Sequence, residues 1–148
     1  MRFVLVFGLL CSGLAACAIA GSGPMVPPAP ISPAPTASAG GLAAARRACN
    51  AAFPPQVGNY LPHAECVNAA IEHHALPHAR YPDLVRLQEQ VRSWYSAQID
   101  EGTITPKTAE TKMDEADELV ARATHERDAG RSDVADAEIA PLQTLLQR

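Results

Sequence analysis

The sequence predicts an all-α fold, a small bundle of three to five helices that occupies residues 42–148. Apolar residues in this region recur every three or four positions, the spacing of helices with one buried face. No stretch shows the alternation of β-branched and polar residues that is typical of strands. These residues, about 107 of the 148 in the chain, are enough for one domain with one modest core.

An alanine-rich segment, Leu42–Ala52, predicts the first helix, which ends at Phe53-Pro54-Pro55. Gly58-Asn59 indicates a turn. A second helix is expected over Tyr60–Ala75. Pro62 is compatible with its first turn, because a backbone N–H there has no partner within the helix.

The third helix has the most regular pattern. It follows a loop at Leu76–Tyr81, begins at Pro82 and Asp83, and ends before Gly102. Its apolar residues fall at intervals of three and four: Leu84, Leu87, Val91, Trp94, Tyr95 and Ile99. Trp94 and Tyr95 are expected either in the core or on a contact surface, since aromatic residues often anchor interfaces.

A short turn separates the third helix from the fourth. Gly102 suits the left-handed conformation that ends many helices, and Thr105 and Pro106 suit the N-cap and first position of the next. The fourth helix is expected to end near Ala129-Gly130. Its apolar face consists mostly of small residues: Ala109, Met113, Ala116, Val120 and Ala123.

A last helix is expected after Ser132, bent or broken at Pro141. Beyond that proline lies a small apolar patch of Leu142, Leu145 and Leu146. Large side chains are scarce in the domain, so its helices must pack closely on alanine, and a covalent cross-link would add useful stability.

The segment before the domain has a different composition. Gly21–Gly41 consists largely of proline, alanine, serine and glycine and carries no charge, which predicts a disordered, extended tether. At about 3.1 Å per residue it would reach up to roughly 60 Å. A proline-motif ligand for a partner domain is the alternative function of this segment.

The first residues have the pattern of a signal peptide. Arg2 precedes a short apolar run, Phe3–Leu10, which is far below the roughly 20 residues that span a bilayer. The run is followed by Leu14-Ala15-Ala16-Cys17, which resembles the lipobox of bacterial lipoproteins. We therefore expect a signal peptide over residues 1–16 and a lipidated cysteine with its tether over residues 17–41.

This resemblance implies that cleavage precedes Cys17 and that its thiol carries the lipid. Several acyl chains, such as palmitate, would make the anchor effectively permanent. Because Ala18 is not the aspartate that retains such proteins at the inner membrane, the resemblance implies the periplasmic face of the outer membrane in a Gram-negative cell. The alternative is a secreted, non-lipidated protein, cleaved after Ala18-Ile19-Ala20 and starting at Gly21.

Two cysteines remain in the mature domain once Cys11 is lost with the signal. In an oxidising envelope, Cys49 and Cys66 predict a disulfide that links the first two helices. Closing a loop of this length stabilises the fold by about 3 kcal/mol in the chain-entropy model. The alternative is a redox-reactive pair, but the C-x-x-C spacing of such pairs is missing.

Four histidines lie close together in the sequence, with acidic residues among them: His63, His73, His74 and His78. Imidazoles and carboxylates could bind zinc or copper, so a metal-binding or metal-sensing domain is an alternative function. The spacing matches no known ligand motif, and adjacent histidines on a helix are expected to project to different faces. We therefore expect exposed polar residues here and no metal.

The net negative charge and the lack of catalytic motifs reduce the number of functions to be expected. The chain has a net charge of −4, and loss of Arg2 leaves 11 basic against 16 acidic residues, or −5, so nucleic acid is not an expected partner. Ser93 and Ser96 lie in no known catalytic motif. We expect no enzymatic activity and no cofactor. The leading hypothesis is a lipid-anchored domain that binds another envelope protein, itself or peptidoglycan; an enzyme with an unrecognised site is the remaining alternative.

Overall fold

The structure, a computed structural model, describes residues 37–148 and confirms the all-α prediction. No strand occurs among these residues. A short 3-10 helix, η1, covers Leu76–His78. The described residues also form five α-helices: α1 (Ala37–Ala52), α2 (Tyr60–His74), α3 (Pro82–Asp100), α4 (Pro106–Asp128) and α5 (Ser132–Leu145).

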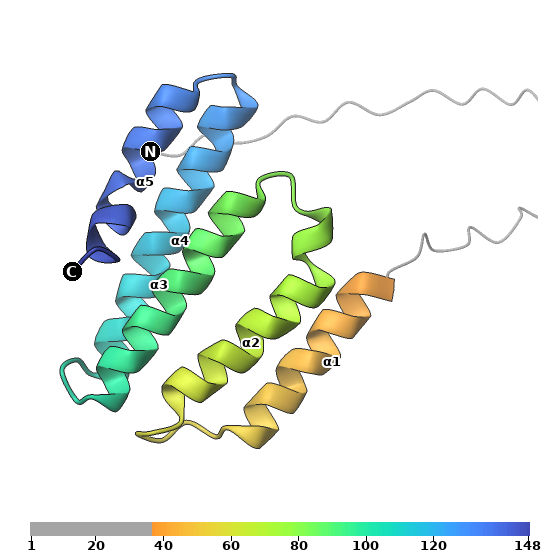
Figure 1. The fold of residues 1–148 in the computed structure, drawn as a ribbon, viewed down its shortest axis with the longest axis vertical. Coiled ribbons are helices and arrows are strands. Elements are labelled where there is room, and N and C mark those ends of the chain that lie inside the picture. The colour runs from red at the N-terminus through yellow and green to blue at the C-terminus, as the bar shows by residue number, and fades with distance from the viewer. Residues whose placement is uncertain (1–36) are drawn as a thin grey trace, which may run out of the picture. The chain divides into compact units, whose positions relative to one another are not determined.

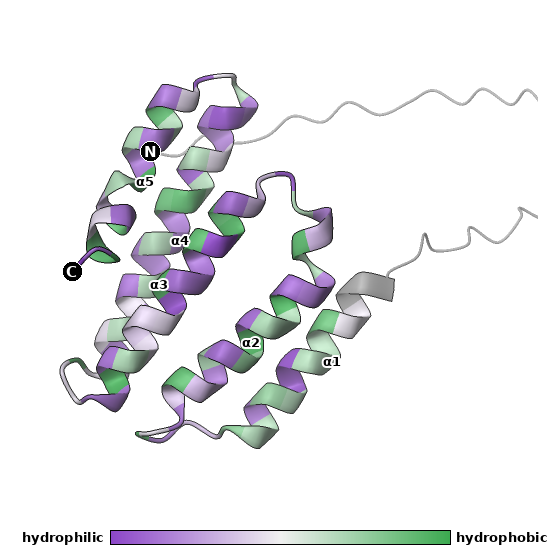
Figure 2. Cartoon of the chain, viewed as in Figure 1, coloured by the Kyte–Doolittle hydropathy of each residue, from purple (hydrophilic) through white to green (hydrophobic). Residues whose placement is uncertain are grey.

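Consecutive helices run antiparallel and pack side by side, with α3 between α2 and α4 (Figure 1). The last helix, α5, packs mainly on α4 and also touches α3. Each helix carries both hydrophilic and hydrophobic residues along its length (Figure 2). None of the described helices is both long and apolar enough to cross a membrane.

The apolar residues form two clusters. The larger, which we call the three-helix core, joins α3, α4 and α5: Leu84, Leu87, Val91, Tyr95, Ile99, Ala109, Ala116, Val120, Ala123, Ala135, Ile139 and Leu142. The smaller, which we call the hairpin cluster, lies between α1 and α2 and contains Cys49, Val67 and Ile71, with Val85 of α3 packed against it. Because α3 contributes to both clusters, it is the helix that unites the domain.

The turns around α4 have the predicted chemistry. Gly102 has a φ of +74°, and the next residue, Thr103, donates its backbone N–H to the carbonyl oxygen of Gln98 at 2.9 Å. This is the bond pattern of a Schellman cap. The hydroxyl of Thr105 accepts the backbone N–H of Thr108 at 3.1 Å, which confirms its N-cap role.

The start of the first helix differs from the prediction, and the structure decides between two forms expected of the last one. α1 begins at Ala37 and not at Leu42, so the last residues assigned to the tether are helical. Gly41 belongs to this added turn, where a Cβ atom would lie only 2.9 Å from the ring of His74, so the absence of a side chain permits close packing of α1 on α2. Of the bend or break expected at Pro141, the break is absent, because α5 continues through the proline to Leu145. Leu142, one residue beyond the proline, is buried in the three-helix core and fixes this turn.

The carboxylate of Asp100, at the end of α3, caps the beginning of α2. It accepts the backbone N–H groups of Gly58 at 2.6 Å, Leu61 at 2.8 Å and Tyr60 at 3.2 Å. The first turn of a helix has N–H groups without a partner in the helix, and here a neighbouring helix supplies the acceptor. Partial burial opposes ionisation of Asp100, but these three bonds outweigh it and lower the pKa of its carboxyl.

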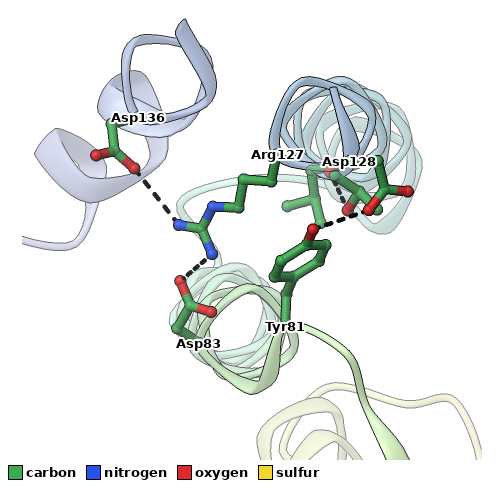
Figure 3. A network of polar contacts seen from close by, with 7 residues as sticks. Tyr81, Asp83, Arg127, Asp128 and Asp136 are labelled. Atoms are coloured by element: carbon green, nitrogen blue, oxygen red, sulfur yellow. Dashed lines mark hydrogen bonds and ion pairs between the residues drawn. The ribbon is translucent and has the colours of Figure 1, made fainter. Parts of the chain in front are cut away.

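A polar network fastens the opposite end of the three-helix core (Figure 3). The guanidinium of Arg127 in α4 contacts Asp83 of α3 at 2.6 Å and Asp136 of α5 at 3.4 Å. The hydroxyl of Tyr81 donates to Asp128 at 2.8 Å. The side chain of Arg127 is only 16% exposed, so this contact is screened less than an ordinary surface ion pair.

Candidate functional site

The best candidate for a binding site is an open groove over α3, bounded by α2 and by the residue that follows α5. Its volume is about 540 Å³. The residues that matter for its chemistry are Asn68 and Glu72 from α2, Arg86, Glu89 and Trp94 from α3, and Leu146. The groove therefore combines polar and charged groups with apolar surface, as ligand sites commonly do.

Asn68 joins α2 to α3 beside the groove and has all its polar atoms occupied. Its side-chain amide donates to the backbone carbonyl of Glu89 at 2.9 Å and to the hydroxyl of Ser93 at 3.0 Å. Its oxygen accepts a hydrogen bond from the guanidinium of Arg92. These three bonds hold one wall of the groove in a fixed position relative to the other.

Glu89 is the unusual residue of the groove. Its side chain is only 5% exposed, yet its Oε1 atom is buried without a hydrogen-bond partner among the described residues. Burial raises the pKa of this carboxyl, and the negative charge of Glu72 raises it further, whereas Arg92 and Arg86 oppose the shift. A buried acceptor without a donor costs free energy, which makes Glu89 a candidate to receive a ligand.

Trp94 and Tyr95, whose placement the sequence left open, separate in the structure. Tyr95 is 9% exposed and belongs to the three-helix core. Trp94 packs partly against that core and lines the groove with the rest of its surface. The two rings meet edge to face, with centroids 4.9 Å apart. Trp94 is the only tryptophan of the chain, so its spectroscopic signals report on the groove.

Sequence reasoning missed Glu89 because it assigned α3 a single buried face. Since α3 lies between α2 and α4, it buries a second stripe, to which Val85 and Glu89 belong. The one available signal was Val85, an apolar residue one turn before Glu89 and outside the main stripe. A helix with two such stripes has neighbours on two sides.

The predicted cysteine pair is brought together by the structure. Cys49 of α1 and Cys66 of α2 form a disulfide, with Sγ atoms 2.10 Å apart and Cα atoms 5.7 Å apart. Cys49 is buried in the hairpin cluster. The bridge thus ties the helix that follows the tether to the rest of the domain. Cys17, the expected lipidation site, lies outside the described residues, as do the expected signal peptide and the expected tether up to residue 36.

The four histidines do not form one cluster. His63 bonds through Nε2 to the side-chain oxygen of Asn50 at 2.7 Å, and His78 is exposed in η1. The prediction that His73 and His74 project to different faces is wrong: their Nδ1 atoms are 3.4 Å apart and their rings are in edge contact. Both lie in the last turn of α2, where the end of the helix leaves the rings room to turn toward each other.

No group of three or more histidine, cysteine, aspartate or glutamate residues in the described part of the chain is arranged to hold a metal ion. A second depression, of about 330 Å³, lies beside His63 and is lined by Phe53 and Tyr60. Its one histidine is already hydrogen-bonded to Asn50, which also lines it. Glu89, whose Oε1 is the buried side-chain atom without a partner among the described residues, lines the groove over α3 and not this depression.

Comparison with protein-family models, with curated proteins and with solved structures finds no match to this chain.

Proposed function

We propose that this protein is a lipid-anchored component of the bacterial cell envelope, whose helical domain binds another component of the envelope and catalyses no reaction. The observation that carries the proposal is Leu14-Ala15-Ala16-Cys17, placed directly after a short apolar run. The uncharged, proline-rich stretch that follows is the composition expected of a spacer between a membrane and a folded domain.

The Cys49–Cys66 disulfide supports a location outside the cytoplasm. Structural disulfides form and persist in oxidising compartments, including the bacterial periplasm, and are rare where thiols are kept reduced. The bridge is built into the packing of α1 on α2, since Cys49 is buried. An exported domain with a thin, alanine-rich core is the kind of domain in which such a bridge contributes most.

The groove over α3 supports a binding role. Glu89 places an unpaired, buried carboxylate oxygen where a fully apolar contact would stabilise the fold better. Residues that weaken a fold are often found where function requires them. Nothing in the groove is arranged for nucleophilic catalysis as far as the structure describes it: the hydroxyl of Ser93 accepts a hydrogen bond from the amide of Asn68.

Paired cysteine variants, expressed in a Gram-negative bacterium, test the anchor. We expect Cys17→Ser to abolish incorporation of labelled palmitate and to release the protein from the membrane fraction. Cys11→Ser is the matched control, because it changes a cysteine inside the predicted signal peptide, and it should leave labelling and fractionation unchanged. Labelling of Cys17→Ser equal to wild type would refute the proposed anchor.

A second substitution tests the expected membrane. Ala18 follows the lipidated cysteine, and Ala18→Asp is expected to shift the labelled protein from the outer to the inner membrane fraction. An unlabelled, soluble product that begins at Gly21 in the wild type would instead support the secreted alternative.

A further inference from the structure

We propose that the groove over α3 binds a small organic ammonium ligand, whose protonated primary amine contacts Glu89 while its carbon chain lies against Trp94. This inference deepens the proposed binding function and rests on it. It concerns the chemistry of the ligand and not the lipid anchor, so each can fail without the other.

The carboxylate of Glu89 lacks a hydrogen-bond donor. Its Oε1 atom is buried and has no donor among the described residues, although nearly all buried polar atoms in folded proteins have a partner. Asn68 and Arg92 are engaged elsewhere, because Asn68 donates to Ser93 and to a backbone carbonyl, and Arg92 donates to Asn68. Arg86 and Gln90 also line the groove, and neither donates to this oxygen. The fold thus leaves this acceptor unsatisfied in a residue that lines the groove, and a turn of the carboxylate toward the groove would bring it to a ligand.

The charged residues of the groove favour a cationic ligand. Glu72 lines the same groove, and its negative charge raises the pKa of Glu89 more than either Arg92 or Arg86 lowers it. Two acids, Glu72 and Glu89, line the groove against one base, Arg86, so its lining carries one more negative than positive charge. A donor that also carries positive charge satisfies the oxygen and the local excess of negative charge together, and charge-assisted hydrogen bonds are about twice as strong as neutral ones.

Apolar surface lies beside the acidic residues of the groove. Trp94 and Leu146 line the groove, and both are only partly buried. An aromatic ring attracts a cation through its π electrons, tryptophan most strongly, and the leucine offers contact for methylene groups. The volume of about 540 Å³ is within the range of small-molecule sites. A bare metal ion fits less well, since no set of three metal-ligating side chains is arranged for it in the described residues.

The test is titration of the full chain, purified in a non-ionic detergent, with n-butylammonium chloride. Trp94 emission and its single indole N–H resonance report binding, with sodium chloride holding the ionic strength constant. We expect a saturable change in both signals. The uncharged isostere 1-butanol should produce less than a tenth of that response at equal concentration.

Variants locate the amine. Glu89→Gln keeps the shape of the side chain and removes its charge, and should weaken binding at least tenfold. Glu72→Gln, at the exposed edge of the groove, should weaken it a few-fold. Glu118→Gln is the matched control, since this exposed residue on α4 does not line the groove. Circular dichroism checks that each variant is folded, and if Glu89→Gln does not fold, Glu72→Gln decides.

Three results would overturn the inference: no saturable response in the wild type, an equal response to 1-butanol, or equal affinity in wild type and Glu89→Gln. An equal response to magnesium chloride would also overturn it, because it would indicate general attraction of cations. None of these results bears on palmitate labelling at Cys17, so failure of this inference is distinguishable from failure of the proposed anchor.

Discussion

Replacing Asp100 by alanine is expected to loosen the contact between α2 and α3. Asp100 is the last residue of α3, where a negative charge is unfavourable for that helix because the helix dipole is negative at its C-terminal end. The same charge is favourable for α2, whose first N–H groups it accepts at 2.6 to 3.2 Å. The residue therefore stabilises a neighbouring helix at the expense of its own.

The magnitude follows from the type of bond. Loss of an N-cap side chain costs about 0.5–2 kcal/mol, and hydrogen bonds to charged groups contribute about 1.5–3 kcal/mol. Asp100 makes three such bonds, but Gly58 is exposed and its N–H group can turn to water after the substitution. We expect Asp100→Ala to lower the free energy of unfolding by about 2 kcal/mol, or Tm by roughly 10 °C for a domain of this size.

The loss should depend on pH with a defined sign. The hydrogen bonds lower the pKa of Asp100 in the folded protein below the value of about 3.9 in the unfolded chain. A lowered folded-state pKa contributes stability that is present above the unfolded-state pKa and is lost as the pH falls through the folded-state pKa. The difference between wild type and Asp100→Asn should therefore be largest above about pH 5 and shrink below about pH 3.

Urea unfolding of the full chain, followed by circular dichroism without reductant, measures this effect. Asp114→Ala is the matched control: Asp114 is an exposed acid in the middle of α4, and its loss should change stability by less than about 0.5 kcal/mol. Equal losses of stability for Asp100→Ala and Asp114→Ala would refute the capping role of Asp100. A loss for Asp100→Asn that does not vary between pH 7 and pH 3 would also refute it.

Three further changes probe the rest of the fold. Glu89→Gln should raise the free energy of unfolding by about 1 kcal/mol at pH 7, because a buried unpaired charge is removed. This gain over the wild type should fade at acidic pH, where the wild-type carboxyl becomes protonated. No gain at pH 7 in urea unfolding would contradict this. Replacing Cys49 and Cys66 together by alanine should lower the free energy of unfolding by about 3 kcal/mol relative to the oxidised wild type. An unchanged urea midpoint would contradict the stabilising role of the bridge. Arg127→Ala should lower the free energy of unfolding by about 1–2 kcal/mol and the thermal midpoint by several degrees. Arg122→Ala breaks a single ion pair that is more exposed to solvent, and it should have little effect. Equal shifts of the midpoint in the two variants would count against the network.

Local signals in the sequence predicted the local features well. Gly102 and Thr105 were placed in their turn from residue type alone, since a left-handed cap and an N-cap hydroxyl depend on a few neighbouring residues. The pairing of Cys49 with Cys66 also followed from the sequence, because no other cysteines are expected in the mature domain apart from Cys17.

Features that depend on which helices meet were not predictable. Asp100 and the N–H groups of α2 are about 40 residues apart in the chain, and nothing in either segment indicates that they meet. Glu89 resembles an ordinary exposed acid until α2 is packed against α3. The early start of α1 was not predictable for a related reason. Glycine commonly marks the end of a helix, but Gly41 lies within α1, where it permits close contact with His74.

The central claim is that Cys17 anchors this domain to a membrane, and one measurement tests it most directly: the intact mass of the mature protein from a membrane fraction, without reducing agent. The proposed account predicts a chain that starts at Cys17, carries an acylated glycerol, and is two hydrogens lighter than the reduced form because of the Cys49–Cys66 bridge. A soluble chain that starts at Gly21 without lipid would contradict the anchor and leave a secreted helical domain.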